Sequence, residues 1–283
     1  MSQLLEVKIT DGLGNQLFQY AAGRSLAIKK GVRNFWLNID SFKHNSLGRE
    51  FGLRNFRTRG KVITNGLVEK ILRKDTKYNR LISAFPFYKV ISDNGLILQD
   101  LSQNNSLLLS LNGYWQSEYY FKDIRSVLLD ELQPVEIPEL PHWLLETETV
   151  AVHVRRTDYL TEKGIGCLGE KYYERAMGII RERIKDPLFV FFSDDIPWCK
   201  QTFPQQRTVF CEQAPWDKDY LQLYLMSKCS HQIVANSSFS WWGAWLNRNP
   251  GKIILRAQTP FVDMSLFPKP HYYPEEWISV NSA

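Results

Sequence analysis

The stretch VAVHVRRTD, residues 150–158, decides how the fold is interpreted. It begins as an apolar run typical of a buried strand and continues into two adjacent arginines where the strand gives way to a loop. Neighbouring side chains on a strand point to opposite faces, so Arg155 and Arg156 are expected to differ, one lying in a cleft and the other bracing the loop. Arginine offers forked donors that match phosphate oxygens. We therefore expect an anion site here; the alternative is one solvated arginine and one ion pair with Asp158.

Strand-like and helix-like segments alternate around this stretch. Strands are expected at residues 150–154, 188–192, 208–211, 232–235 and 252–255. Helices are expected at residues 170–184, 196–203, 219–228 and 239–247. This alternation predicts an α/β fold with a largely parallel, doubly wound sheet. Because ligands of such sheets gather beyond the carboxyl ends of the strands, residues 153–158, 193–195 and 236–242 are expected to meet in one crevice.

The first half of the chain opens in a similar way. Residues 4–9 alternate like a strand, residues 11–16 form a glycine-containing turn, and a helix is expected over 17–29 with Gly31 closing it. Glycines at such a turn let backbone amides approach a ligand, and the positive end of the helix favours anions. Two glycines without a third fall short of the dinucleotide fingerprint, so no redox cofactor is expected.

A proline-rich connector separates the two halves. The stretch PVEIPELP, residues 134–141, has no periodic apolar pattern and is typical of a linker. We expect an N-terminal α/β lobe over residues 1–140 and a C-terminal Rossmann-like lobe over residues 141–283.

The stretch NSSFSWWG, residues 236–243, leaves a strand and enters an aromatic helix. Ser237 or Ser238 at the helix cap would offer hydroxyl and backbone donors together, which suits a phosphate. The alternative is an ordinary cap followed by core aromatics, because aromatic stripes on helices usually pack inward. That core would include Trp241, Trp242 and Trp245.

Composition places limits on the class of protein. The chain has 283 residues, 44% of them hydrophobic and 23% charged, which is typical of a soluble globular protein. No apolar run approaches the roughly 20 residues of a membrane helix, and the N-terminus lacks the features of a signal peptide, so a cytoplasmic location is expected. The four cysteines show no CxxC spacing and are expected to be buried free thiols rather than disulfides or a zinc site.

The net charge of +5 is unevenly distributed. Residues 54–89 hold ten Lys and Arg against two acidic residues, and residues 67–74 have the pattern of a short amphipathic helix. Such a patch could make peripheral contact with an anionic membrane; the alternative is a solvated face. Nothing in it resembles a base-reading module, so no nucleic-acid partner is expected.

Four segments together resemble the bacterial α-1,2-fucosyltransferases of glycosyltransferase family 11. They are GLGNQLFQYAAG (12–23), VHVRRTDYL (152–160), FFSDD (191–195) and LMSKCSHQIVANSSFSWWGAWL (225–246). The resemblance implies a GT-B arrangement, with two Rossmann-like lobes, parallel sheets and a donor cleft between them. It also implies inverting transfer of fucose from GDP-β-L-fucose to a galactose-terminated acceptor, with no metal or other cofactor. The acceptor would be a galactoside oligosaccharide or a lipid-linked glycan, as in O-antigen or polysaccharide biosynthesis.

By the same resemblance, Arg155 would hold the β-phosphate and His153 would help to bind the nucleotide. Ser237, Ser238 and Phe239 would line the diphosphate and sugar, and Asn15 would approach the donor from the N-terminal lobe. The full expected donor set is Gly14, Asn15, Gln16, His153, Arg155, Arg156, Asp194, Gln222, Asn236, Ser237, Ser238 and Phe239.

The guanine-reading position departs from the family pattern. Relatives often carry an acidic residue just before the LM-S-x-C segment, whereas this chain has Gln222, with Asp219 three residues earlier. The N1 and N2 hydrogens of guanine call for an acceptor, which a carboxylate supplies better than an amide.

Transfer also needs groups that stabilise the leaving diphosphate and accept the acceptor's proton. Arg155 and a helix N-terminus would stabilise the growing charge without a metal. Asp158 and Glu162 are the candidate bases, Asp158 alternatively being an ion-pair partner that orients Arg155 or Arg156. The D-x-D sequence Asp217-Lys218-Asp219 resembles a metal motif, but it lies at an expected helix start, where acidic residues are common.

The acceptor side is expected to use the aromatic residues Tyr114, Trp115 and Tyr119, although such residues equally suit a core. Two other interpretations stay open: a transferase with another donor or linkage on the same scaffold, and a non-catalytic nucleotide- or glycan-binding protein.

Overall fold

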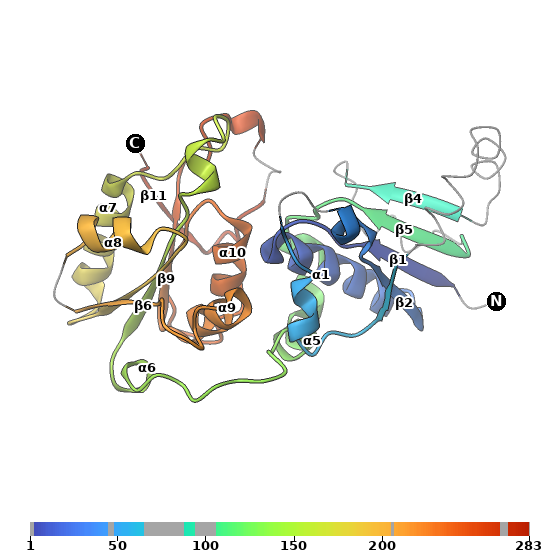
Figure 1. The fold of residues 1–283 in the computed structure, drawn as a ribbon, viewed down its shortest axis with the longest axis horizontal. Helices are drawn as coiled ribbons and strands as arrows, with labels where there is room; N and C mark the ends of the chain where they lie inside the picture. Colours follow the sequence, from blue (N-terminus) through green and yellow to red (C-terminus); the bar gives the residue numbers. More distant parts are fainter. Residues whose placement is uncertain are drawn as a thin grey trace. The chain divides into compact units, whose positions relative to one another are not determined.

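The computed structural model describes residues 3–44, 48–64, 88–93, 106–204, 207–266 and 271–282 (Figure 1). The chain divides into two compact units, Met1–Gln133 and Pro134–Ala283. Each unit contains its own sheet, and every strand pair described in both sheets is parallel. The α/β class with two parallel sheets, expected from the alternation of segments, is confirmed.

In the N-terminal unit the described strands run in the order β3-β2-β1-β5-β4. Their bounds are β1 (Leu4–Lys8), β2 (Asn34–Asn38), β3 (Lys61–Ile63), β4 (Tyr88–Ser92) and β5 (Leu108–Asn112). The helices are α1 (Leu13–Lys29) and α5 (Arg125–Glu131), with short 3-10 turns η1 (Asp40–His44), η2 (Gly52–Asn55), η3 (Glu118–Tyr120) and η4 (Lys122–Ile124).

Helix α1 starts earlier than its sequence pattern predicted, at Leu13 rather than at residue 17. Its N-cap is Gly12, and it ends where Gly31 adopts a left-handed φ of 62°, the usual role of a glycine after a helix. A Cβ on Gly23 would lie 2.3 Å from Val7 Cγ2, so this glycine lets the helix approach β1 closely. The expected ligand-binding turn is therefore largely the first turn of the helix itself.

In the C-terminal unit the strand order is β11-β10-β9-β6-β7-β8. The strands are β6 (Thr149–Val154), β7 (Leu188–Ser193), β8 (Thr208–Phe210), β9 (His231–Ile233), β10 (Ile254–Ala257) and β11 (Ile278–Val280). The helices are α6 (Trp143–Glu146), α7 (Glu170–Arg183), α8 (Ile196–Thr202), α9 (Asp219–Lys228) and α10 (Ser238–Trp245), with short turns η5 (Asp158–Leu160) and η6 (Met264–Leu266). All five strands and four helices predicted after residue 148 are confirmed, with ends shifted by at most two residues.

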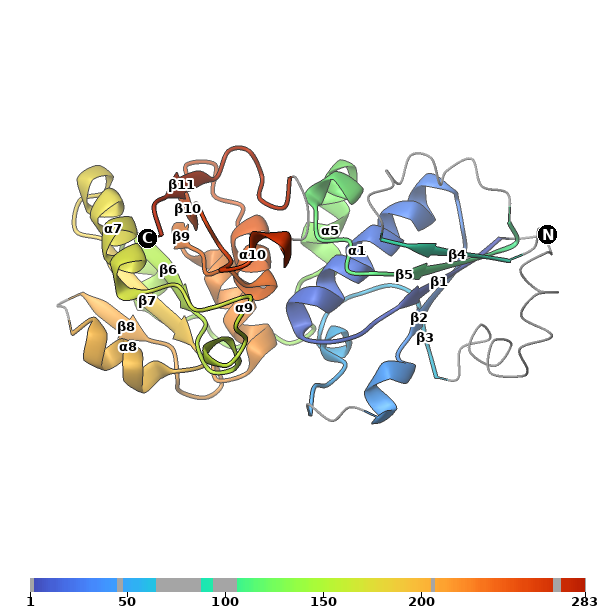
Figure 2. The same cartoon turned by 90° about the horizontal axis from the view of Figure 1, so that it is seen from above.

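Both faces of this second sheet are covered by helices (Figure 1 and Figure 2). Val150 and Val152 of β6 pack with residues of α7 and α8, whereas Ala151 packs with residues of α9. Alternate side chains thus enter two separate cores, which is why the strand is apolar throughout rather than at every second position.

The cysteines, the absence of a predicted membrane helix and the basic segment 54–89 can be compared with the described residues. All four cysteines lie in the described part of the chain and are free, three of them buried and Cys167 half-buried. Among the described residues, no helix has both the length and the apolar character that crossing a membrane requires. The predicted helix at 67–74 and most of the basic segment 54–89 lie outside the described residues.

Candidate active site

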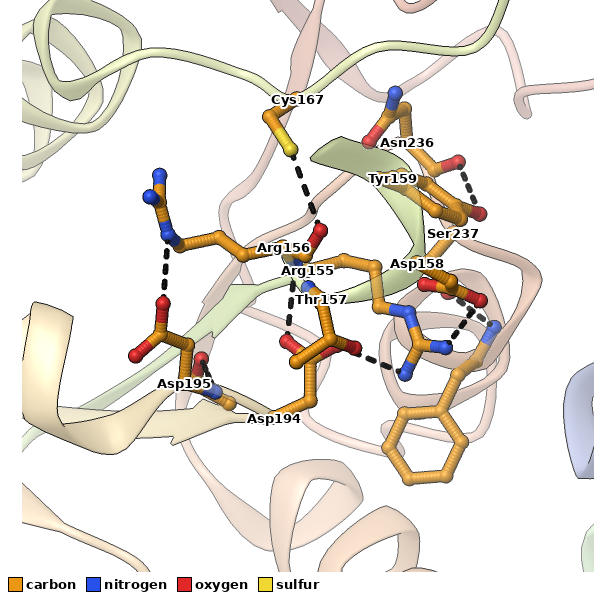
Figure 3. A network of polar contacts seen from close by, with 12 residues as sticks. Arg155, Arg156, Thr157, Asp158, Tyr159, Cys167, Asp194, Asp195, Asn236 and Ser237 are labelled. Atoms are coloured by element: carbon orange, nitrogen blue, oxygen red, sulfur yellow. Dashed lines mark hydrogen bonds and ion pairs between the residues drawn. The ribbon is translucent and has the colours of Figure 1, made fainter. Parts of the chain in front are cut away.

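The register of the second sheet brings three loops to one edge. Strand β6 pairs with β7 so that Val154 lies opposite Ser193, and with β9 so that Val152 lies opposite Ile233. Because all three strands are parallel, the segments that follow them leave at the same edge. The structure thus brings together the three segments that the sequence pattern placed in one crevice (Figure 3).

Arg155 is held between two carboxylates at this edge. Its guanidinium donates to Asp158 Oδ2 at 2.7 Å, and its other terminal nitrogen lies 3.2 Å from Asp194 Oδ2. Partial burial would lower the pKa of Arg155, but the hydrogen bond to Asp158 and the charges of Asp194 and Asp158 outweigh burial and raise it. The group is therefore a permanent cation with forked donors on a partly exposed side chain.

Arg156 points elsewhere and has a different role. Its Nε donates to Asp195 Oδ2 at 3.0 Å, and its guanidinium carbon lies 3.9 Å from the centroid of the Trp198 ring. Asp195 also accepts the Trp198 backbone N–H at 3.2 Å, so it is the N-cap of α8. Arg156 thus braces the loop against α8, and its expected place in the donor set receives no support from this geometry.

The start of α10 lies next to the arginine loop. Ser237 caps the helix by accepting the Phe239 N–H at 3.3 Å, and Ser238 is the first helical residue. The Tyr159 hydroxyl donates to the Asn236 carbonyl at 3.4 Å, while the Tyr159 ring lies 5.6 Å from the Arg155 guanidinium carbon. Arg155 and the capped helix start therefore share one neighbourhood through Tyr159.

His153 is buried beneath this neighbourhood. It lies on β6, two positions before Arg155 in the chain, and its ring centroid lies 5.4 Å from that of Phe239. Burial and the positive charge of Arg155 lower the pKa of His153 to about 3, against the weaker effect of Asp194. The imidazole is therefore neutral at ordinary pH, and its buried Nδ1 has no hydrogen-bond partner among the described residues. It can offer a ligand a neutral polar group but is a weak base.

Asn236 is a structural residue in this arrangement. Its side-chain amide donates to the carbonyls of Gly166 and Pro260, at 3.0 and 2.7 Å. These bonds fasten two neighbouring loops to the end of β9. Only the side-chain oxygen of Asn236, Oδ1, is left by these two bonds to contact a nucleotide-sugar donor, as the sequence led us to expect.

The described hydrogen bonds of three other candidate residues, Glu162, Gln222 and Asp219, do not involve the Arg155 side chain. Glu162 is exposed, and its backbone N–H donates to the Asp158 carbonyl at 3.2 Å. Gln222 lies on α9, and its side chain donates to the Cys211 carbonyl at 3.4 Å. Asp219 begins α9 and accepts the Tyr220 N–H at 2.6 Å. Across the described residues, no group of three His, Cys, Asp or Glu side chains could hold a metal ion.

In the N-terminal unit, the expected donor residues lie in the first turn of α1. Gly14 and Gln16 are buried, and Gln16 donates to the carbonyls of Asp11 and Glu50 and accepts the Gly52 N–H. Asn15 is half-buried and accepts a hydrogen bond from Gln116 at 2.8 Å. Gln16 thus serves the backbone of its own unit, while Asn15 keeps a partly accessible amide.

The three aromatic residues expected on the acceptor side differ in exposure. Tyr114 and Tyr119 are 46% and 43% exposed, and the Tyr114 hydroxyl donates to Asp11 at 2.9 Å. Trp115 is 0% exposed and packs edge-on against Tyr120, with ring centroids 5.3 Å apart. Trp115 is therefore a core residue, and only the two tyrosines present a surface that a glycan could contact.

Sequence reasoning missed three residues of the site: Thr157, Tyr159 and Trp198. Thr157 and Tyr159 lie inside the quoted motif and could have been found as polar neighbours of the arginine pair. Trp198 carries no such signal, because its contact with Arg156 spans two elements.

Comparison with known proteins defines the class: the chain is a glycosyltransferase. It belongs to glycosyltransferase family 11, whose family model matches residues 1–281.

Individual relatives agree with that family. The chain is 30% identical over 296 residues to an α-1,2-colitosyltransferase of Escherichia coli, covering 98% of this chain and 99% of the relative. It is 33% identical over 147 residues to galactoside α-(1,2)-fucosyltransferase 1 of Bos taurus, covering 47% of this chain and 39% of that enzyme. Among solved structures, NodZ α-1,6-fucosyltransferase soaked with GDP-fucose matches with a TM-score of 0.50 at 11% identity, covering 87% of this chain and 93% of that chain. This last likeness concerns the fold.

Proposed function

We propose that the protein is a galactoside α-1,2-L-fucosyltransferase, which transfers fucose from GDP-β-L-fucose to a galactose-terminated glycan with inversion and without a metal. The observation that carries the proposal is the placement of Arg155 beside the capped start of α10, linked to it through Tyr159. Membership of family 11 and relatives named as α-1,2-transferases support the class of reaction.

The proposed chemistry follows from the charges at this edge. Cleavage of the sugar–phosphate bond leaves negative charge on the departing GDP, and the sugar passes through an oxocarbenium-like state. Arg155 would hold the β-phosphate, and the positive N-terminal end of α10, at Ser237 and Ser238, would face the same diphosphate. Such fixed positive groups stabilise a growing charge without reorganising during the reaction.

The acceptor hydroxyl loses its proton as its oxygen bonds to the sugar carbon. Asp158 and Glu162 are the proposed recipients, since both belong to the arginine loop. A dissociative transition state needs little help from a base, so either carboxylate contributes a modest factor. Near-normal turnover in both Asp158→Asn and Glu162→Gln would exclude both as bases.

A second donor is favoured by one specific relative. The relative that aligns over 98% of this chain is named a colitosyltransferase, so transfer of colitose with the same linkage is the alternative. Colitose lacks the 3-hydroxyl of fucose, and a site built to bond that hydroxyl would discriminate strongly between the two sugars.

We also propose which residues contact the acceptor, the donor and its guanine base, and what kind of acceptor is used. Tyr114 and Tyr119 are proposed acceptor contacts, and Asn15 a proposed donor contact, on the N-terminal unit. The guanine-reading group is proposed to be Gln222. The acceptor is proposed to be an oligosaccharide or a lipid-linked glycan reached from the cytoplasm, with peripheral contact to an anionic membrane.

The test combines binding with transfer. Calorimetry with GDP is paired with an assay that offers GDP-fucose and GDP-colitose with a β-galactoside acceptor, and the product linkage is determined by NMR. We expect GDP binding and α-1,2-transfer of fucose. Arg155→Ala should lower transfer by about a hundredfold or more and weaken GDP binding, because the leaving charge loses its cation.

Arg183→Ala is the matched control, since Arg183 is an exposed arginine at the end of α7. It should behave like the unmodified protein. Unchanged transfer in Arg155→Ala would refute the role of Arg155 in holding the β-phosphate. Transfer of colitose but not of fucose would show that the donor is GDP-colitose. GDP binding without any transfer would indicate a non-catalytic binding protein.

A further inference from the structure

Arg155 faces more negative charge than it can neutralise. Its single guanidinium contacts the carboxylates of Asp158 and Asp194, at 2.7 and 3.2 Å. A guanidinium has a limited number of donors directed along fixed lines. A diphosphate that binds Arg155 must therefore share it with both carboxylates or replace one of them.

The two carboxylates are not held in the same way. Asp194 accepts hydrogen bonds from the backbone N–H groups of Arg156 and Thr157, at 2.9 and 3.1 Å, and from the Thr157 hydroxyl. Its side chain is 19% exposed. Asp194 is thus built into the turn that carries Arg155, and moving it would undo the backbone of that turn.

Asp158 has a more accessible position. Its side chain is 38% exposed, and it belongs to η5, a single short turn three residues after Arg155. The next residue, Tyr159, reaches the Asn236 carbonyl, so Asp158 comes from the loop that meets the start of α10. Asp194, by contrast, comes from the end of β7. Asp158 therefore contacts Arg155 from the loop where the proposed diphosphate would lie.

We infer that the two carboxylates act in opposite directions on donor binding: Asp194 is a positioning residue that holds Arg155, and Asp158 occupies the diphosphate's place on Arg155 and is displaced by it. This inference rests on the proposed function, because it takes a nucleoside diphosphate as the ligand. Arg155 then exchanges one anion for another while its second ion pair stays intact.

The exchange also connects binding with proton transfer. Once displaced, the Asp158 carboxylate is no longer neutralised by Arg155 and can accept a proton. The acceptor O–H bond breaks and its proton goes to Asp158, the acceptor oxygen bonds to the sugar carbon, and the sugar–phosphate bond breaks with its electron pair leaving on GDP. Donor binding thus prepares the group that receives the proton.

Two substitutions of equal size separate the roles. In Asp158→Asn the competing charge is removed, so GDP should bind about two- to fivefold more tightly, as expected for a partly exposed ion pair. Transfer should nevertheless slow, giving a lower donor KM together with a lower kcat. In Asp194→Asn the turn loses its charged acceptor, so GDP should bind about tenfold more weakly and the donor KM should rise.

Thr157→Val is the second variant for Asp194. It keeps the backbone N–H and the shape of the side chain but removes the hydroxyl donor, so GDP should bind more weakly by about threefold. This variant leaves Asp158 and Arg155 unaltered and gives the answer if Asp194→Asn does not fold, which thermal melting would show.

The measurements are calorimetric titrations of each variant with GDP and, separately, with inorganic pyrophosphate. Opposite signs for Asp158→Asn and for the Asp194 and Thr157 variants, with both probes, support the inference. Equal or weaker binding in Asp158→Asn, or tighter binding in the Thr157 variant, overturns it. Failure of the unmodified protein to bind GDP refutes the proposed donor instead, and the pyrophosphate titration still tests the exchange.

Discussion

The Arg156 guanidinium carbon lies 3.9 Å from the centroid of the Trp198 ring, while its neighbour Arg155 faces the opposite partners, Asp158 and Asp194. Two adjacent arginines thus belong to different parts of the molecule. One is held against helix α8, and the other is directed to the edge where α10 begins.

This division predicts different consequences for the two arginines. Arg156→Ala removes a cation–π contact and an ion pair on a side chain that is mostly buried, so the free energy of unfolding should fall by about 1–2 kcal/mol. Arg155→Ala should change that free energy less and ligand binding more. Urea unfolding of both variants measures this, and equal losses of stability would contradict the division.

The low pKa of His153 predicts a loss of stability in acid. The folded-state pKa is about 3, whereas an unfolded histidine titrates near 6.5. As the pH falls below about 6.5, the unfolded state binds a proton that the folded state does not, so the free energy of unfolding decreases down to the folded pKa.

The matching experiment compares unfolding at neutral pH and at about pH 5.5. Between these two pH values the free energy of unfolding of the unmodified protein should fall by about 1 kcal/mol more than that of His153→Phe, which keeps a ring beside Phe239. His142→Phe, at an exposed position, should retain the unmodified slope. The same slope in His153→Phe as in the unmodified protein would show that His153 does not cause the loss.

Gln16 is predicted to support the fold rather than a ligand. Gln16→Ala would leave two backbone carbonyls and one backbone N–H without their partner, so stability should fall by about 2–3 kcal/mol. Gln133→Ala is the control, because the Gln133 side chain makes a single described bond, to the Leu129 carbonyl, and should cost well under half as much. Thermal or urea unfolding of both variants provides the comparison.

The D-x-D sequence is predicted to have no part in metal binding. Asp219 lies in the first turn of α9, where a negative charge stabilises the positive helix end by about 0.5 kcal/mol. The double substitution Asp217→Asn with Asp219→Asn should therefore lower stability slightly and leave transfer near its unmodified level. Assays in excess chelator should give the same rate as assays with added Mg²⁺ or Mn²⁺; a rate restored only by the metal would overturn this prediction.

The sequence alone determined the local parts of this protein. The alternation of strands and helices, and the capped helix start at Ser237 and Ser238, follow from residues within a few positions of one another. Such features depend on backbone propensity and short-range hydrogen bonds, which a linear pattern records. Two element ends differ from the local pattern: α1 begins at Leu13, four residues before its predicted start, and β9 ends at Ile233, two residues before its predicted end.

Only the tertiary structure decided which residues meet. The parallel register that sets Val154 opposite Ser193 carries Arg155 toward Asp194 and Arg156 toward Asp195, partners that lie 39 positions apart in the chain. Burial likewise assigned Trp115 to the core and left Tyr114 exposed, although the two are adjacent. Sheet register and side-chain packing arise from contacts among distant segments, so no local pattern contains them.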